Sequence, residues 1–428
     1  MSVQPSLFPV APARPLRRLD PLELSRDIQR FDQFGASTAE GRTTVEAGPH
    51  GPLAVPTYTN AFWTSRQRAA HTLHEISYRA CFKAQLPRFF IERLTSEDQV
   101  VYDPFMGRGT TPLEAALLGR RPLGCDISPL AAVMVSPRLA PPTAADVGTR
   151  LNSLALTDRD EFPEDLLAFY HPDTLREICA LKKYLLGRRA GGDLDPIDAW
   201  IEMVALNRLT GHSPGFFSVY TMPPNQAVSV QSQQKINRAR DQVPPRRDVR
   251  GIIAAKTRSL LAACDPAAMA RLQKAGRTAL FLTADADQTP QIADRSVHLA
   301  VTSPPFLDVV DYASDNWLRC WFIGIEADKV PISVFRRLDD WRAKMTRVLT
   351  EVRRTLVEGG YVAFEVGEVK GAKVKLEEAA LLAGVAAGLT PVFVLINSQP
   401  FTKTANCWGV TNNAKGTNTN RVVLLRSS

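Results

Sequence analysis

Two polar turns in this chain combine residue types that could do chemistry. One is Asp103-Pro104-Phe105-Met106-Gly107-Arg108-Gly109-Thr110-Thr111, after apolar residues 100–102, and the other is Ser303-Pro304-Pro305-Phe306, after the strand-like residues 298–301. Glycines at 107 and 109 allow a tight turn and a close approach of the backbone to a ligand. The helix expected after them offers free N–H groups to a carboxylate or phosphate. The first turn therefore predicts a ligand-binding loop.

The second turn offers hydrogen-bond acceptors in a rigid frame. Ser303 supplies a side-chain oxygen and Pro304 a carbonyl, and the two prolines fix the backbone without adding an N–H. Acceptors at both protons of an amino group favour a pyramidal nitrogen and take up the positive charge that develops when it attacks an electrophile. Phe306 can stack on a base that has left its helix. The turn needs no strong general base, because the proton can leave to water after transfer.

An acidic residue follows the ligand loop about one helix later, as Asp126 in Leu123-Gly124-Cys125-Asp126-Ile127. An acid at the end of the second strand is where a ribose diol is usually bound. A glycine-rich turn alone is weak evidence, because dinucleotide enzymes and many plain turns share it. Its combination with Asp103 and Asp126 points more specifically to a nucleoside cofactor.

Together, these segments resemble the cofactor and catalytic loops of class I S-adenosylmethionine-dependent DNA amino-methyltransferases, the N4-cytosine and N6-adenine enzymes. The resemblance covers about 60–135 and 280–425. It implies that loop 103–111 holds the methionine end of S-adenosylmethionine, that Asp126 binds the ribose hydroxyls and that Ile127 lies on the adenine face. Asp285 would reach the adenine amino group, with Asp287 as the competing candidate. The implied cofactor residues of the loop are Asp103, Pro104, Phe105, Gly107, Gly109, Thr110 and Thr111, and the implied catalytic residues are Ser303, Pro304, Pro305 and Phe306.

The target base is less clearly indicated. Serine at the first position of the catalytic tetrapeptide is typical of N4-cytosine members, whereas Asp or Asn is typical of adenine, RNA and protein-glutamine members. Most Ser-Pro-Pro members, however, place the catalytic loop first. Here the cofactor loop comes first, as in many adenine enzymes, which assigns target recognition to the region between the loops. We therefore expect site-specific methylation of double-stranded DNA at cytosine N4. Methylation of adenine N6 is the first alternative and methylation of an RNA base the second. A non-enzymatic DNA-binding module is a further alternative, but it would not need both loops.

The order of strand, loop, helix and strand predicts an α/β fold. By the resemblance it is Rossmann-like, with a mostly parallel seven-stranded sheet. Residues 60–94 have a helical pattern, and 140–275 interrupt the α/β alternation as a mainly helical insertion. We expect a flexible arm over 1–50, a catalytic domain over 51–139 and 276–428, and target recognition in 140–275. Strands are expected at 99–102, 122–126, 279–282, 298–301, 361–366, 391–396 and 421–425.

Charge and short motifs suggest partners. Residues 235–258 hold eight basic and two acidic residues, most of the excess behind the chain's net charge of +8. Such a stretch can neutralise phosphates, although a solvated surface explains it equally well. The candidate DNA-binding residues are Arg238, Arg240, Arg246, Arg247, Arg250 and, in the tail, Lys415. Gln4-Pro5-Ser6-Leu7-Phe8 resembles peptides that bind sliding clamps, and a cognate restriction endonuclease is a further candidate partner.

Composition excludes several classes. No apolar run reaches the roughly 18 residues needed to span a bilayer, and the N-terminus has no apolar signal core, so we expect a cytoplasmic protein without a membrane partner. The six cysteines are scattered without zinc-ligand spacing, which predicts reduced thiols and no metal site.

Overall fold

The computed structural model describes residues 19–46, 51–63, 70–78, 81–157, 162–222, 227–305, 312–367, 374–398 and 419–428. Three sequence predictions fall outside these ranges: the clamp-like segment Gln4–Phe8, the aromatic Phe306 of the catalytic turn and the candidate DNA contact Lys415.

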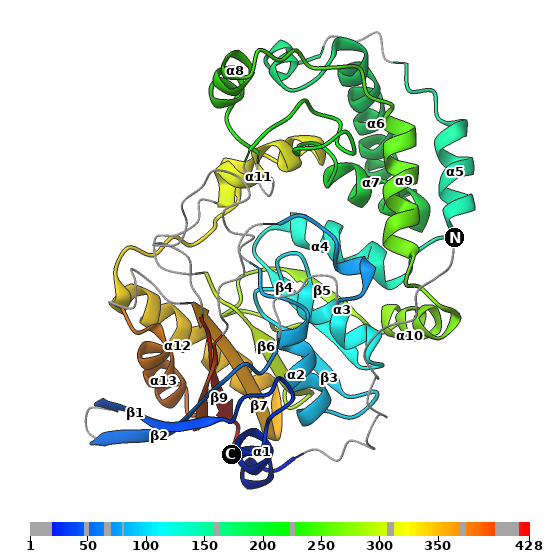
Figure 1. The fold of residues 1–428 in the computed structure, drawn as a ribbon. Helices are drawn as coiled ribbons and strands as arrows, with labels where there is room; N and C mark the ends of the chain where they lie inside the picture. Colours follow the sequence, from blue (N-terminus) through cyan, green and yellow to red (C-terminus); the bar gives the residue numbers. More distant parts are fainter. Residues whose placement is uncertain are drawn as a thin grey trace.

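One sheet organises the molecule, in the order β1-β2-β8-β9-β7-β6-β3-β4-β5 (Figure 1). Numbered in chain order from β3, the seven strands from the β5 edge to β8 have the order 3-2-1-4-5-7-6. The pairs β3–β4, β4–β5, β3–β6 and β6–β7 are parallel, and β9 is antiparallel to both its neighbours. This is the Rossmann-like arrangement, with its reversal of strand order between β3 and β6. The strands are β3 (Val100–Asp103), β4 (Arg121–Asp126), β5 (Leu280–Thr283), β6 (Val297–Thr302), β7 (Leu356–Gly367), β8 (Thr390–Ser398) and β9 (Thr419–Arg426).

The sheet has nine strands and not the expected seven, because the N-terminal region adds a hairpin. β1 (Ala39–Glu46) pairs with β2 (Pro52–Asn60), and β2 continues the sheet beside β8. The prediction of a flexible arm over 1–50 is therefore wrong for its described part. Helix α1 (Pro21–Gln29) has a capping box between Asp20 and Glu23, and it buries Leu24 and Ile28 completely. Two apolar residues in one helix are too weak a sequence signal to predict this packing.

Residues alternate between the two faces of the central strands. Val101 and Leu299 face a core shared with α1 and α2 (Gln85–Leu94), whereas Tyr102 and Ala300 face a core shared with α12 (Leu338–Thr355) and α13 (Leu376–Ala386). The sheet is thus covered on both sides, as a mostly parallel sheet requires.

Among the described residues of 60–94, where a helical pattern was expected, an α-helix forms only at the end, as α2. Asn60 ends β2, and the next N–H groups, of Phe62 and Trp63, donate to the Asn397 side chain of β8. Both aromatic rings then pack on Phe89 of α2. These tertiary contacts favour a non-helical backbone after β2. The described residues between β2 and α2 contain one short 3₁₀ turn, η3 (Thr72–His74).

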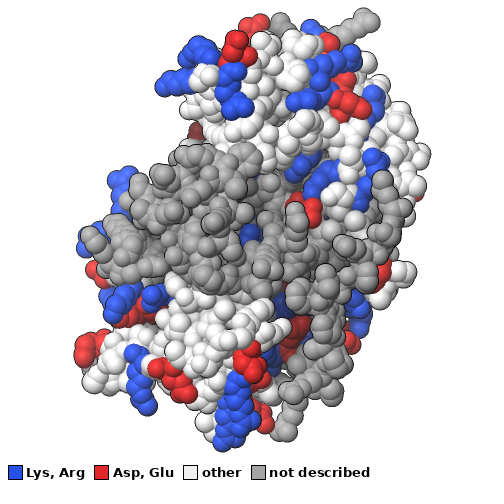
Figure 2. Space-filling view, viewed as in Figure 1, with Lys and Arg blue, Asp and Glu red and all other residues white. Residues whose placement is uncertain are grey.

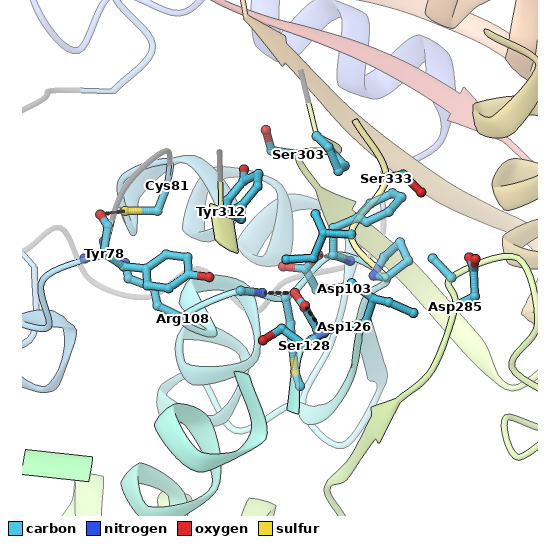
Figure 3. A pocket seen from close by; sticks show the side chains of 18 of the residues that line it. Tyr78, Cys81, Asp103, Arg108, Asp126, Ser128, Asp285, Ser303, Tyr312 and Ser333 are labelled. Atoms are coloured by element: carbon cyan, nitrogen blue, oxygen red, sulfur yellow. Dashed lines mark hydrogen bonds between the residues drawn. The ribbon is translucent and has the colours of Figure 1, made fainter. Parts of the chain in front are cut away.

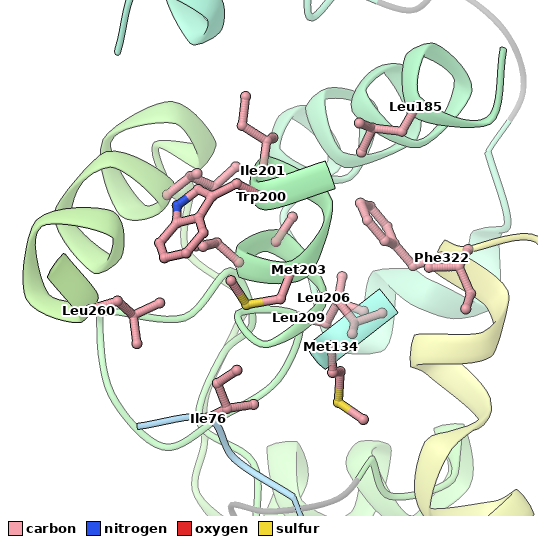
Figure 4. Close-up of a cluster of buried hydrophobic side chains, with 14 of the residues drawn as sticks. Ile76, Met134, Leu185, Trp200, Ile201, Met203, Leu206, Leu209, Leu260 and Phe322 are labelled. Atoms are coloured by element: carbon pink, nitrogen blue, oxygen red, sulfur yellow. The ribbon is translucent and has the colours of Figure 1, made fainter. Parts of the chain in front are cut away.

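The insertion between β4 and β5 is mainly helical (Figure 1). Several of its helices begin at a proline after a side chain that caps the first turn, as Asp195 does before Pro196 and Asp265 before Pro266. Its core, with Trp200 and Leu260, continues into Met134 and Phe322 of neighbouring helices, so the insertion packs on the sheet domain (Figure 4). The helices from β3 to α11 are α3 (Thr110–Leu117), α4 (Pro129–Val135), α5 (Ala144–Ser153), α6 (Pro172–Ala190), α7 (Pro196–Leu206), α8 (Val230–Ala239), α9 (Val249–Leu261), α10 (Pro266–Gly276) and α11 (Tyr312–Phe322).

Candidate active site

A cavity lies at the carboxyl ends of β3, β4 and β6, beside the reversal of strand order, where ligands of such sheets bind. Its empty volume is about 970 Å³, including the open mouth. Figure 3 shows Ser303 and Tyr312 on one side of this space and Asp126 and Ser128 on the other. The cavity is lined by ten residues predicted from the sequence: Asp103, Pro104, Phe105, Gly107, Thr110, Asp126, Ile127, Asp285, Ser303 and Pro305.

Three predicted residues support the cavity without lining it. Gly109 has a φ of +75° at the start of α3, in the left-handed region that favours glycine. Thr111 donates its hydroxyl to the Val301 carbonyl at 3.0 Å, which ties the ligand loop to the strand that carries the catalytic turn. Pro304 lies within that turn.

Asp103 joins the two loops directly. Its Oδ1 accepts the Thr302 hydroxyl at 2.6 Å and the Phe105 N–H at 3.1 Å. Burial raises the pKa of this carboxyl to about 7, against the opposing effect of these hydrogen bonds. Asp103 can therefore lose or gain a proton near neutral pH when a charged ligand enters.

Asp126 stands at the end of β4, as predicted, and shapes the ligand loop. Its Oδ2 accepts the Gly107 N–H at 2.8 Å and its Oδ1 accepts the Ser128 N–H at 2.9 Å. Burial raises its pKa although both hydrogen bonds oppose this. Each carboxylate oxygen can accept a second hydrogen bond, so Asp126 keeps capacity for a ligand hydroxyl.

Asp285 lines the cavity but is engaged by a lysine that the sequence analysis did not single out. Lys344 of α12 donates to both oxygens of Asp285, at 2.6 and 2.7 Å, and to Asp287 at 2.8 Å. Lys344 is buried and itself lines the cavity. It therefore fixes the Asp285 carboxylate, whereas Asp287 also pairs with Arg347 and does not line the cavity.

The turn that begins at Ser303, predicted to be catalytic, is held by Glu365 and Trp341, which the sequence analysis did not single out. Ser303 donates its hydroxyl to Oε2 of Glu365 at 2.5 Å, and Asn420 donates to Oε1 at 3.0 Å. Burial raises the pKa of Glu365. The Pro305 carbonyl accepts the Trp341 indole N–H at 2.8 Å. Because the Ser303 hydrogen points to Glu365, the lone pairs of its oxygen are left to accept from a ligand.

One of the residues that the sequence analysis missed could have been found from the sequence. Glu365 is a charged residue within the apolar strand pattern Tyr361-Val362-Ala363-Phe364-Glu365-Val366, and a buried charge in a strand is uncommon. Tyr78 and Phe335 also line the cavity. Neither belongs to a motif or a regular element, so only the tertiary structure reveals them.

The predicted DNA-binding arginines do not form one patch. Figure 2 shows basic side chains on separate parts of the insertion with acidic ones between them, and Figure 1 shows α8 and α9 on opposite sides of it. Arg238 is exposed and Arg240 lies over the Tyr220 ring at 3.9 Å. Arg246 is exposed, with Glu177 at 3.9 Å, and Arg247 is half-buried. Arg250 donates to the Leu151 and Leu154 carbonyls, so its guanidinium holds the insertion together.

The strand order and the two joined loops are those of a Rossmann-like methyltransferase fold. Residues 51–133 match the family model N6_N4_Mtase, described as DNA methylase. It is 32% identical over 74 residues to the type II methyltransferase M.MjaII of Methanocaldococcus jannaschii. That match covers 17% of this chain and 14% of the relative, so the chain spans about one seventh of the relative's length.

Solved structures are similar only at a distance. A putative DNA modification methylase of Thermus thermophilus is 22% identical, with 34% of this chain and 52% of that chain covered and a TM-score of 0.22. The rRNA methyltransferase aviRa of Streptomyces viridochromogenes is 12% identical, with 86% and 95% covered and a TM-score of 0.32. The fold assignment therefore rests on the strand order. None of the helices in the described ranges is long and apolar enough to cross a membrane.

Proposed function

We propose that this protein transfers a methyl group from S-adenosylmethionine to the exocyclic amino group of a base in double-stranded DNA. Cytosine N4 is the first candidate target and adenine N6 the second; an RNA base is a weaker alternative. The observation that carries the proposal is that Ser303 shares one cavity with Asp103 and Asp126. The acceptor for an amino group and the acids of a ligand loop thus lie in one space, as amino methylation requires.

The residues of the cavity fit S-adenosylmethionine. The carboxyl groups of Asp103 and Asp126 line the space, which suits a ligand that carries a sulfonium and an ammonium group, whereas the Asp285 carboxylate is already bound by Lys344. Asp126 would hold the ribose hydroxyls, and the loop around Gly107 the methionine end. When bound, the cofactor supplies an electrophilic methyl group.

Ser303 would receive the base at the mouth of this cavity. Its oxygen accepts one amino proton, because its own hydrogen is directed to Glu365, and the Pro304 carbonyl is the candidate for the second. Both acceptors stabilise positive charge on the attacking nitrogen. Glu365 acts as a positioning residue, since it bonds to Ser303 and does not line the cavity.

Nucleoside analysis tests the proposal. We expect N4-methylcytosine in enzymatic digests of genomic DNA from a host that expresses the protein, at sites that long-read sequencing can map. N6-methyladenine instead would support the alternative target. If both are absent while the protein is folded and binds S-adenosylmethionine, DNA methylation is wrong. A cognate endonuclease and a sliding clamp at Gln4–Phe8 remain predictions from the sequence.

Binding of S-adenosylmethionine is expected to release a proton from Asp103. Its pKa is about 7 in the free protein, and a nearby cation lowers it. The cofactor therefore binds the ionised form better, so its Kd should fall as pH rises from about 6 toward about 7.5 and then level off. Calorimetry in buffers of different ionisation enthalpy measures the proton count. Asp103→Asn should bind with little dependence on pH over this range; the wild-type slope in this variant would contradict the assignment.

A further inference from the structure

Arg208, after α7 in the insertion, is a buried cation whose Nε has no hydrogen-bond partner among the described residues. Its side chain is 9% exposed, and the Nε atom itself is buried. Arg108 and Arg138 are also buried but differ in this respect. The Nε of Arg108 donates to the Thr110 hydroxyl at 3.2 Å and the Nε of Arg138 to the Met134 carbonyl at 2.9 Å. A buried charge is costly unless it is paired, so a ligand that brings a counter-charge to Arg208 would be favoured.

The charges around Arg208 are mostly positive. Burial and the charge of Arg319 lower its pKa to about 10, while Glu75 acts in the opposite direction. Glu75 also forms an ion pair with Lys256, whose Nζ lies 3.2 Å from the Glu75 carboxylate. Asp315 offsets Arg319 in part. Three cations therefore face two carboxylates, and an anion is the ligand that this cluster would favour.

This cation cluster lies between the insertion and the cavity. Arg208 and Lys256 come from the insertion, whereas Arg319 belongs to α11, which follows the catalytic loop. Arg319 donates to the Ser77 carbonyl at 3.0 Å and lies 5.8 Å from the Tyr78 ring, which lines the cavity. Arg208 is held in place by its stacking on Phe216, at 4.0 Å from the ring centre. The guanidinium is thus held by Phe216, and its neighbour Arg319 connects it to the cavity-lining Tyr78.

We propose that Arg208 binds a backbone phosphate of DNA beside the nucleotide whose base enters the cavity. This inference rests on the proposed function and gives the insertion a specific part in it. A guanidinium suits a phosphate because it can donate two parallel hydrogen bonds. A base turned out of the duplex stays attached to its phosphates, which remain at the mouth of the site. Arg208 would hold that phosphate while Ser303 holds the amino group.

The test is the salt dependence of DNA binding, with the full-length protein and a fluorescent duplex between about 50 and 200 mM salt. Arg208→Met keeps an apolar stem on Phe216 and removes the charge. We expect a roughly tenfold weaker Kd and a slope of log K against log salt that is smaller by about 0.9, the loss of one phosphate contact. Arg208→Lys should keep the wild-type slope, and the Kd of S-adenosylmethionine should not change in either variant.

Arg277→Met is the matched control, since Arg277 is an exposed arginine just after α10 and outside the basic stretch 235–258, and it should leave Kd nearly unchanged. An unchanged slope for Arg208→Met would overturn the inference, even if Kd rises through a change in the fold. Arg208→Gln is a second neutral variant if the methionine variant does not fold. If the wild type methylates DNA but the slope is unchanged, only the inference fails. If the wild type neither binds nor methylates duplex DNA, the proposed substrate fails as well. The same holds if Arg208→Met weakens the salt dependence of binding to RNA and not to DNA.

Discussion

Ser303→Ala is expected to lower the rate of methyl transfer by about 10²- to 10³-fold, the range for removing one group that stabilises developing charge. The variant loses the oxygen that accepts an amino proton, but the ligand loop is untouched. The Kd of S-adenosylmethionine should therefore stay the same. Single-turnover transfer from radiolabelled S-adenosylmethionine and calorimetric binding measure the two quantities separately.

Two variants make this result specific. Ser296→Ala removes a half-buried serine just before β6, whose hydroxyl donates to the Ala293 carbonyl at 2.7 Å, and should leave the rate unchanged. Glu365→Gln keeps an acceptor for the Ser303 hydroxyl, so most of the rate should remain if Glu365 only positions it. Full turnover by Ser303→Ala would refute the catalytic role assigned to this side chain.

Gly109→Ala is expected to have the largest effect on stability and cofactor binding. Gly109 has a φ of +75°, and an added Cβ would lie 2.2 Å from Cγ2 of Val135. The left-handed conformation costs a non-glycine residue about 1–2 kcal/mol, and overpacking costs a further 1–3 kcal/mol, roughly. We expect urea unfolding to show a loss of about 2–5 kcal/mol, and the Kd of S-adenosylmethionine to rise by about tenfold or more as the loop shifts.

Two controls separate the clash from the backbone strain. Val135→Ala in the Gly109→Ala background removes both methyl groups and should restore part of the stability, leaving only the strain. Gly148→Ala lies inside α5 with open space around it. It should stabilise the protein by about 0.5–1 kcal/mol, since alanine is the better helix residue. Equal destabilisation by both alanine substitutions would contradict this account.

Much of the fold was predictable because its strands are strongly apolar and bounded by turns. All seven expected strands overlap observed ones. The hairpin of β1 and β2 was not predictable. Its first strand is mostly exposed, so no alternation of apolar and polar residues marks it.

The residues of the candidate site also include some that the sequence predicts and some that it does not. Asp103, Asp126 and Ser303 belong to local motifs, and the structure brings them together around one cavity. Their roles in cofactor and base binding remain proposals. Lys344 and Glu365 act over distances of 59 and 62 residues, on Asp285 and Ser303. Contacts of this kind depend on strand order and helix placement, which a single sequence does not encode locally.

The insertion leaves the sheet after β4 and returns at β5, two strands that are neighbours and parallel. We propose that this insertion recognises the target DNA, and a detour between two neighbouring strands could be exchanged for another without disturbing the sheet. The contacts of the last helix of the insertion, however, limit such an exchange. α10 packs on α3, the helix that begins at the ligand loop, and Arg271 of α10 donates to the Leu117 carbonyl at 2.8 Å. A transplanted recognition region would have to retain α10, so the boundary of any exchangeable cassette lies before Pro266.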